Sequence, residues 1–169
     1  KNLNINYFSC VPPFNQMGAR EALTSPKTAP AIAEMVAAFQ ERRGLVVSGL
    51  NAIDGITCQN PLGAFYVFPN IAGACERLGI MDAIARLPDD VKKTTTPSTL
   101  FQNFLLFNHG VAAVDRRSFG RIGTENMHFI RLSIATGIDD LRQAVANIAA
   151  AADDKAGFAK FVAEGTNLA

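Results

Sequence analysis

The chain has 169 residues, of which 49% are apolar, so it can bury one compact core but is too short for two full domains. Its 16 Lys and Arg residues balance 15 Asp and Glu residues, and these charges are scattered along the chain rather than collected in one stretch. This distribution argues against binding to nucleic acid or to a membrane surface.

The expected compartment follows from the hydropathy and the cysteines. No apolar run approaches the ~20 residues that a membrane span needs, and the chain does not open on a basic and apolar leader. The cysteines, Cys10, Cys58 and Cys75, are far apart and show no CxxC spacing. We therefore expect a soluble, cytoplasmic protein with free thiols. A start at Lys1, without Met, is what a processed or truncated product would show.

The first part of the chain predicts two helices. Residues 2–13 alternate loosely and end in Pro12-Pro13, which favours an extended segment closed by a turn. A short helix is expected from Asn15 to Leu23. After Pro26, apolar residues recur at three-and-four spacing up to Leu50, which predicts the longest helix of the chain, with Ser25 or Thr28 as its cap.

The middle of the chain predicts strands and two further helices. Residues 56–71 contain two strand-like pieces separated by 60–63, and the second piece, Ala64 to Phe68, is aromatic and β-prone. Helical spacing runs from Ala72 to Leu87, and the polar run Asp89 to Thr96 is expected to be a loop. Thr96 and Pro97 then begin a helix that Gly110 ends.

The last part predicts two strands followed by two helices. Val111 to Val114 is a short apolar strand, and Met127 to Ala135 is the clearest strand in the sequence. Residues 136–139 resemble a capping box that opens a helix through Ala152, and Lys155 to Glu164 forms a final helix. The order of elements predicts an α/β or α+β fold in which a small sheet is covered by helices.

Arg131 is the strongest candidate for a functional residue. Period two places Ile130, Leu132 and Ile134 on one face of the predicted strand, and Phe129, Arg131 and Ser133 on the other. A guanidinium is always charged, and its planar fork of donors fits a carboxylate or a phosphate. From the residues alone, two interpretations stay open: an anion clamp facing a cleft, and a structural arginine that pairs with a local Asp or Glu or lies on a solvated face.

The other polar residues indicate no catalytic or metal site. His109 lies beside the helix stop Gly110, where a cation complements the carbonyl end, and His128 opens the last strand. Neither has a His or Cys partner at ligand spacing, so no metal site is expected. The sequence contains no GxSxG, Walker or GxGxxG motif, and the Phe-rich stretches are typical of a core.

Four stretches, in order along the chain, together resemble one known family. They are SCVPPFNQMGAREAL (Ser9 to Leu23), ERRGLVVSGLNAIDGITCQNPLGAFYVFPNI (Glu41 to Ile71), GVAAVDRRSFG (Gly110 to Gly120), and HFIRLSIAT followed by Asp139-Asp140-Leu141. The second is similar to the start of the small domain of class I/II aminotransferases of fold type I. The third is similar to their GVxVxPGxxFG loop, and the fourth to their strand with the substrate-binding arginine.

This resemblance implies a fold, a cofactor and a site. The chain would be the C-terminal part of an aminotransferase that uses pyridoxal 5'-phosphate: residues 1–25 end the large cofactor-binding domain, and residues 26–169 form the small domain with a mixed or antiparallel sheet. Arg131 would bind the α-carboxylate of an amino-acid substrate, with a 2-oxo acid as the second substrate. The resemblance also implies a homodimer.

The lysine that carries the cofactor is expected upstream of Ser9. No lysine of this chain stands in a matching context, so the chain alone is expected to be inactive and not to hold the cofactor covalently, and its cofactor-binding residues are unknown. The sequence departs from the family pattern at two places: Arg116-Arg117 replace the Pro-Gly of the family loop, and Gly44 replaces the acidic residue that is usual in the long helix. Alternative functions are a stand-alone ligand-binding or interaction domain, and a lyase or synthase of the same fold that uses the same cofactor.

Overall fold

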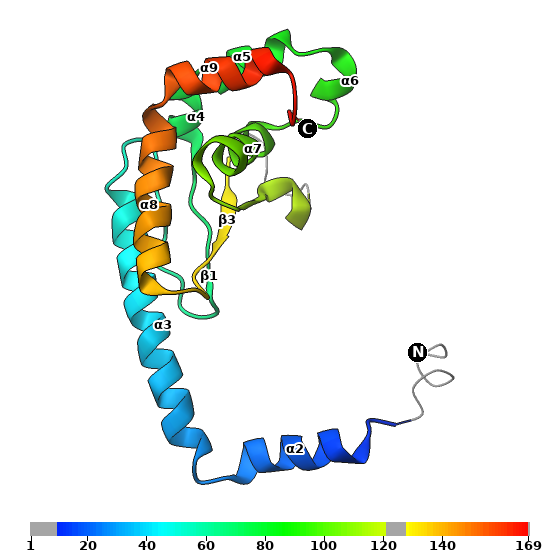
Figure 1. Ribbon diagram of the computed structural model, residues 1–169, viewed down its shortest axis with the longest axis vertical. Coiled ribbons are helices and arrows are strands. Elements are labelled where there is room, and N and C mark those ends of the chain that lie inside the picture. Colours follow the sequence, from blue (N-terminus) through cyan, green and yellow to red (C-terminus); the bar gives the residue numbers. More distant parts are fainter. Residues whose placement is uncertain (1–9, 121–127, 169) are drawn as a thin grey trace. The chain divides into compact units, whose positions relative to one another are not determined.

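The computed structural model describes residues 10–120 and 128–168 (Figure 1). The chain divides into two compact units, one up to Ala38 and the other from Phe39 onward. The division falls within a single long helix. The expected domain boundary between residues 25 and 26 stays a prediction.

The first unit contains helix α2 (Pro13–Thr24) and the first part of α3 (Thr28–Asn51). The predicted helix from Asn15 to Leu23 is confirmed, and it starts earlier because a proline fits the first helical turn. None of the residues of α2 is buried. Of the predicted extended segment 2–13, residues 2–9 lie outside the described part of the chain.

The end of α3 anchors the second unit. The predicted long helix is confirmed, and Val46 and Leu50 in its second half are buried as expected, whereas Ile32, Met35 and Val36 of the predicted apolar face are exposed. The side chain of Asn51 bonds the backbone of Cys58 twice: its Nδ2 donates to the carbonyl at 2.9 Å, and its Oδ1 accepts from the amide at 2.8 Å. Figure 1 shows this part of α3 beside α8 (Ile138–Asp153). They pack so closely that a Cβ on Gly49 would lie 2.7 Å from Val145 Cγ1.

The sheet has three short strands in the order β1-β3-β2, and both pairings are antiparallel. The strands are β1 (Tyr66–Val67), β2 (Val114–Asp115) and β3 (Ile130–Ser133). The expected strand over Val111 to Val114 is thus shifted toward the C-terminus, and only the centre of the stretch from Met127 to Ala135 is a strand, with Met127 outside the described residues. Strand pairing extends only as far as a partner backbone is within hydrogen-bonding reach, and the sequence of one segment cannot specify how long the paired stretch is.

The two faces of β3 differ as period two predicts. Ile130, Leu132 and Ile134 are buried, whereas Phe129 and Arg131 are half-buried and Ser133 is exposed. The core contains Phe101 and Phe104 of α7 (Pro97–His109), a helix that also contacts β2. The predicted α+β fold, a small antiparallel sheet covered by helices, is therefore confirmed.

Two expectations about the helices after β1 were wrong. The single helix predicted from Ala72 to Leu87 is two helices, α4 (Ala72–Leu78) and α5 (Ile80–Arg86), because Gly79 adopts a left-handed conformation with φ +73°. The predicted loop after it contains a short helix, α6 (Asp89–Lys92). Pro88 precedes this helix and two acidic residues stand in its first turn, which favours a helix start over a loop.

Local capping explains the remaining helix ends. Thr96 Oγ1 accepts a hydrogen bond from the Thr99 amide at 3.1 Å, and Gly110 ends α7 with φ +67°, as predicted. The predicted capping box at 136–139 is wrong: Gly137 precedes α8, and the Thr136 hydroxyl donates to Asp140 at 3.0 Å. The final helix, α9 (Lys155–Glu164), has the predicted bounds and is capped by Asp154.

Candidate functional site

Arg131 lies in the middle strand of the sheet, opposite Val114 of β2. Its side chain lies on the half-buried face of β3, opposite the buried Ile130 and Leu132. Two aromatic rings lie near the guanidinium: its Cζ is 4.3 Å from the ring centroid of Tyr66 and 4.8 Å from that of Phe119.

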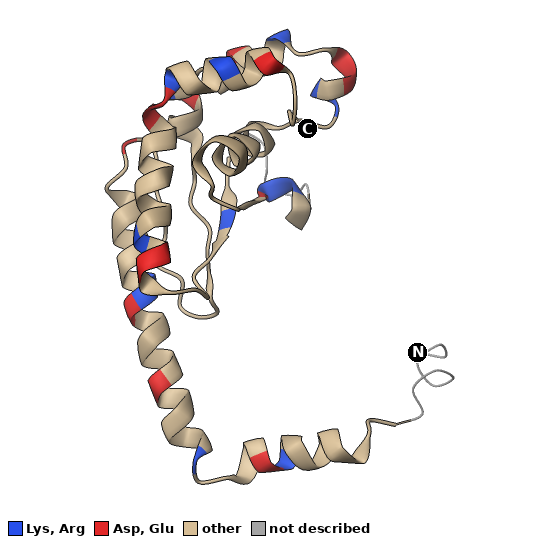
Figure 2. Ribbon diagram, in the orientation of Figure 1, with Lys and Arg blue, Asp and Glu red and all other residues tan. Residues whose placement is uncertain are grey.

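The structural interpretation of Arg131 takes one of two forms, an acidic partner nearby or a place on a solvated face, and the ion pairs bear on the first. In residues 10–120 and 128–168, the cations within 4.0 Å of a carboxylate are Arg77, Lys92, His109, Arg142 and Lys160, and Arg131 is not among them. Figure 2 shows basic and acidic residues interspersed along the helices. A half-buried guanidinium that pairs with no carboxylate of the described residues can accept an external anion. The anion clamp stays a prediction.

The segment after β2 is held by a buried carboxylate. Asp115 is 6% exposed, and it accepts hydrogen bonds from the Ser118 amide at 3.0 Å and from the Thr99 hydroxyl at 2.5 Å. It thereby caps the 3-10 helix η1 (Arg116–Phe119), which carries Phe119.

The two arginines that depart from the family loop also bond to the backbone. Arg116 Nη1 donates to the Gly120 carbonyl at 3.0 Å, and Arg117 donates to the Thr94 carbonyl. The arginines, which stand where the family loop has Pro-Gly, thus tie η1 to the neighbouring backbone.

A cavity of about 680 Å³ opens on the same face of the sheet as Arg131. Its walls include the rings of Tyr66, Phe68 and Phe129, together with the amide side chains of Asn60 and Asn70. Aromatic walls with a few polar groups are typical of a small-molecule site. Arg131 does not itself line this cavity, but it contacts the ring of Tyr66, which does, so the two are neighbouring parts of one candidate site.

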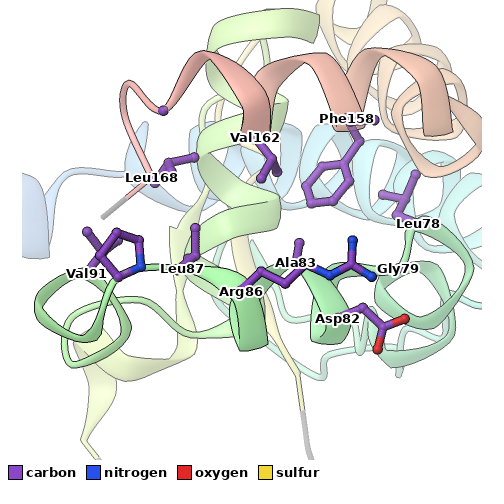
Figure 3. A pocket seen from close by; sticks show the side chains of 13 residues that line it. Leu78, Gly79, Asp82, Ala83, Arg86, Leu87, Val91, Phe158, Val162 and Leu168 are labelled. Atoms are coloured by element: carbon purple, nitrogen blue, oxygen red, sulfur yellow. The ribbon is translucent and has the colours of Figure 1, made fainter.

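A second cavity, of about 590 Å³, lies between α5 and α9 and has no comparable chemistry. Figure 3 shows Phe158, Val162 and Leu168 facing Ala83, Leu87 and Val91 across it. The charged side chains that line it are Asp82 and Arg86, and both residues are exposed. Its apolar walls give no means of activating a substrate.

The two histidines make packing and backbone contacts of a structural kind. His109 ends α7 as predicted, its ring packs edge-on against Phe104, and its Nε2 lies 3.4 Å from Asp154 Oδ2 without hydrogen-bond geometry. His128 is half-buried, and its carbonyl accepts from the Ile71 amide at 2.7 Å. Burial lowers the pKa of the His128 imidazole from its ordinary value, with a smaller opposing effect of Glu76.

The described lysines offer no buried amine. Lys27, Lys93, Lys155 and Lys160 are exposed, and the half-buried Lys92 lies 3.6 Å from Asp89 of the same short helix. Across the ranges that the structure describes, no three His, Cys, Asp or Glu residues gather in a way that could hold a metal ion.

The three cysteines are unpaired, and Cys58 and Cys75 are buried. Burial, with a smaller contribution from the nearby Glu76, raises the pKa of the Cys75 thiol to about 12. Of the helices described here, none is both long enough and apolar enough to cross a bilayer.

Sequence reasoning from the residues found Arg131 but missed Asp115, Tyr66 and Phe119. A signal for Asp115 was present, because Asp is one of the residues favoured at the start of a helical turn. The aromatic pair carried no comparable local signal: Tyr66 and Phe119 come close to Arg131 only through the pairing of β1, β2 and β3.

Comparisons with known proteins agree with this geometry. The model of the family "Aminotransferase class I and II" matches residues 3–148. The chain is 37% identical over 145 residues to an aspartate aminotransferase of Rhizobium meliloti, covering 86% of this chain and 31% of that protein. It is 39% identical over 135 residues to an aspartate/prephenate aminotransferase of Cereibacter sphaeroides, covering 80% and 30% respectively.

Solved structures give the same answer. The aspartate aminotransferase from Rhizobium meliloti superposes with a TM-score of 0.61 at 37% identity, over 82% of this chain and 30% of that one. An aromatic aminotransferase from Pyrococcus horikoshii superposes with a TM-score of 0.65 at 27% identity, over 88% and 34%. The chain spans about a third of the length of these relatives. With a family match over most of its length, the chain belongs to the class I and II aminotransferases.

Proposed function

We propose that this chain is the C-terminal part of an enzyme that transfers an amino group between an amino acid and a 2-oxo acid, and that Arg131 binds the α-carboxylate of the substrate. The observation that carries this proposal is the position of Arg131. It lies mid-strand on the face away from the core, beside a cavity, and no carboxylate of the described residues pairs with it.

The contribution of the chain to the reaction is orientation. Two parallel N–H···O bonds from the guanidinium hold a carboxylate in the plane of the fork and limit its rotation. A fixed carboxylate fixes the Cα beside it, so the bond that reacts keeps one direction relative to the rest of the site. Pyridoxal 5'-phosphate, when bound, supplies a sink for the negative charge that develops at Cα. We assign no described residue of this chain to hold it, and the lysine that carries it is proposed to lie upstream.

Several wider features of the enzyme belong to the same proposal. The names of the relatives make aspartate the first amino donor to test. The three unpaired cysteines support a reducing compartment, and we propose the cytoplasm. A homodimer and a domain boundary near residue 25 are proposed from the family resemblance.

Substitution of Arg131 in the complete enzyme tests the proposal. Lysine keeps the charge but loses the fork, so Arg131→Lys is expected to impair the reaction, and Arg131→Ala to impair it more. Losing a charge-assisted bidentate contact costs about 3 kcal/mol, roughly a hundredfold in kcat/KM. The loss should appear with every amino-acid substrate, because all share the α-carboxylate, while cofactor binding is spared.

Arg142 provides the matched control. It is an exposed arginine that pairs with Asp139 of its own helix at 2.7 Å, so Arg142→Ala should leave kcat/KM unchanged. The assignment of Arg131 fails if Arg131→Ala keeps kcat/KM for the best substrate within about threefold of the parent enzyme.

A further inference from the structure

The guanidinium of Arg131 is enclosed by two aromatic rings that come from the two sides of β3. Tyr66 belongs to β1, where it pairs with Ser133, two residues along the same face of β3. Phe119 belongs to η1, which directly follows β2 on the other side. The distances from Arg131 Cζ to the ring centroids, 4.3 Å and 4.8 Å, are within the ~6 Å over which a cation is attracted to an aromatic ring.

The two rings are themselves held in place. Phe119 meets Phe68 edge-on, with ring centroids 5.8 Å apart, and Phe68 stacks on Phe129 at 5.3 Å. The ring of Tyr66 lies 4.5 Å from that of Phe65. Asp115 caps the short helix that carries Phe119. The rings are thus supported by contacts that do not involve Arg131.

The rings are also the interactions that fix the arginine. Within residues 10–120 and 128–168, the Arg131 side chain makes no hydrogen bond and no ion pair. Its interactions with these residues are the cation–π contacts with the two rings. The donors of a guanidinium lie in its plane, and its faces are weakly hydrated. Two rings that approach the Cζ from the sides of β1 and β2 therefore restrict the plane of the guanidinium while they leave its N–H edge available.

We propose that Tyr66 and Phe119 are positioning residues: they clamp the guanidinium of Arg131 so that its N–H edge is presented to the substrate carboxylate. This inference rests on the proposed role of Arg131. The rings act through the arginine and need not touch the substrate. Their faces matter, and the Tyr66 hydroxyl does not.

The test uses the complete enzyme loaded with pyridoxal phosphate and measures kcat/KM for its best amino-acid substrate. Tyr66→Leu and Phe119→Leu remove the ring faces, and each is expected to lower kcat/KM about tenfold. Phe119→Tyr keeps the ring and should stay within about twofold of the parent, and Tyr66→Phe, which also keeps the ring, should lose less activity than Tyr66→Leu. Phe119 is 45% exposed, so its replacement carries the smaller folding risk, and the cofactor absorbance of each variant reports an intact site.

A double-mutant cycle with Arg131→Ala separates a positioning role from a general structural one. If the rings act through the arginine, the leucine variants lose their effect when Arg131 is already alanine. An equal effect in both backgrounds overturns the proposal, as do leucine variants with parental activity or a Tyr66→Phe variant as impaired as Tyr66→Leu. If Arg131→Ala lowers kcat/KM but the leucine variants do not, the positioning role of the two rings is refuted and the role of Arg131 stands. If Arg131→Ala leaves kcat/KM unchanged, both the proposed function and the positioning role are refuted.

Discussion

The substitution Gly73→Ala probes a close backbone contact between two segments of the second unit. Gly73 is the second residue of α4 and faces Gly55, in the turn that follows α3. A Cβ on Gly73 would lie 2.5 Å from Gly55 Cα and 3.0 Å from its carbonyl oxygen. The same carbonyl accepts a hydrogen bond from the Ala74 amide at 3.1 Å. The added methyl group must therefore push the two segments apart where the hydrogen bond from Ala74 to Gly55 joins them.

The expected change in stability follows from three contributions. Overpacking typically costs about 1–3 kcal/mol. Loss of the hydrogen bond from Ala74 to Gly55 costs about 1 kcal/mol. Alanine in place of glycine in a helix offsets about 1 kcal/mol of this. The free energy of unfolding should therefore fall by about 2 kcal/mol.

Gly44→Ala is the matched control, because it adds the same methyl group to a helix where no atom lies within 4 Å of the new Cβ. Its free energy of unfolding should rise by about 0.5–1 kcal/mol. Urea denaturation followed by far-UV circular dichroism measures both variants. The midpoint should move down for Gly73→Ala and up for Gly44→Ala. A Gly73→Ala protein as stable as the parent would show that the two segments do not approach as closely as described.

Three further predictions concern individual buried groups. Asp115→Ala should lower the free energy of unfolding by about 2 kcal/mol, because the Thr99 hydroxyl and the Ser118 amide lose their acceptor, whereas Asp139→Ala at an exposed pair should change it by less than about 0.5 kcal/mol. Since burial lowers the pKa of His128, the unfolded chain binds more protons than the folded chain below about pH 6.5, so the free energy of unfolding decreases as the pH is lowered. In urea titrations at several pH values, His128→Gln should reduce this dependence of stability on pH; an unchanged dependence would contradict the burial effect. Alkylation followed by mass spectrometry at neutral pH should modify the exposed Cys10 first and Cys75 only after unfolding, because the Cys75 thiol is buried and its pKa is about 12; equal rates would rule out the buried position.

The amino-acid sequence alone determined the features that depend on neighbours within a few residues. Thr96 and Gly110 set the ends of α7, because a cap and a left-handed residue act on adjacent backbone groups. Alternation along β3 placed Arg131 on the face opposite Ile130 and Leu132, because side-chain direction in a strand is a local property. The resemblance to the aminotransferases rested on motifs of the same local kind.

Only the tertiary structure decided how segments distant in sequence meet. The order β1-β3-β2 and the short ladders depend on which backbones come within hydrogen-bonding reach, which no single segment specifies. The close contact of Gly55 with Gly73 likewise joins two segments that fold separately along the chain. Tyr66 and Phe119 lie against Arg131 because β3 pairs with β1 on one side and β2 on the other. A sequence pattern can show that an arginine needs a partner, but the surroundings of its side chain are set by the packing of the whole unit.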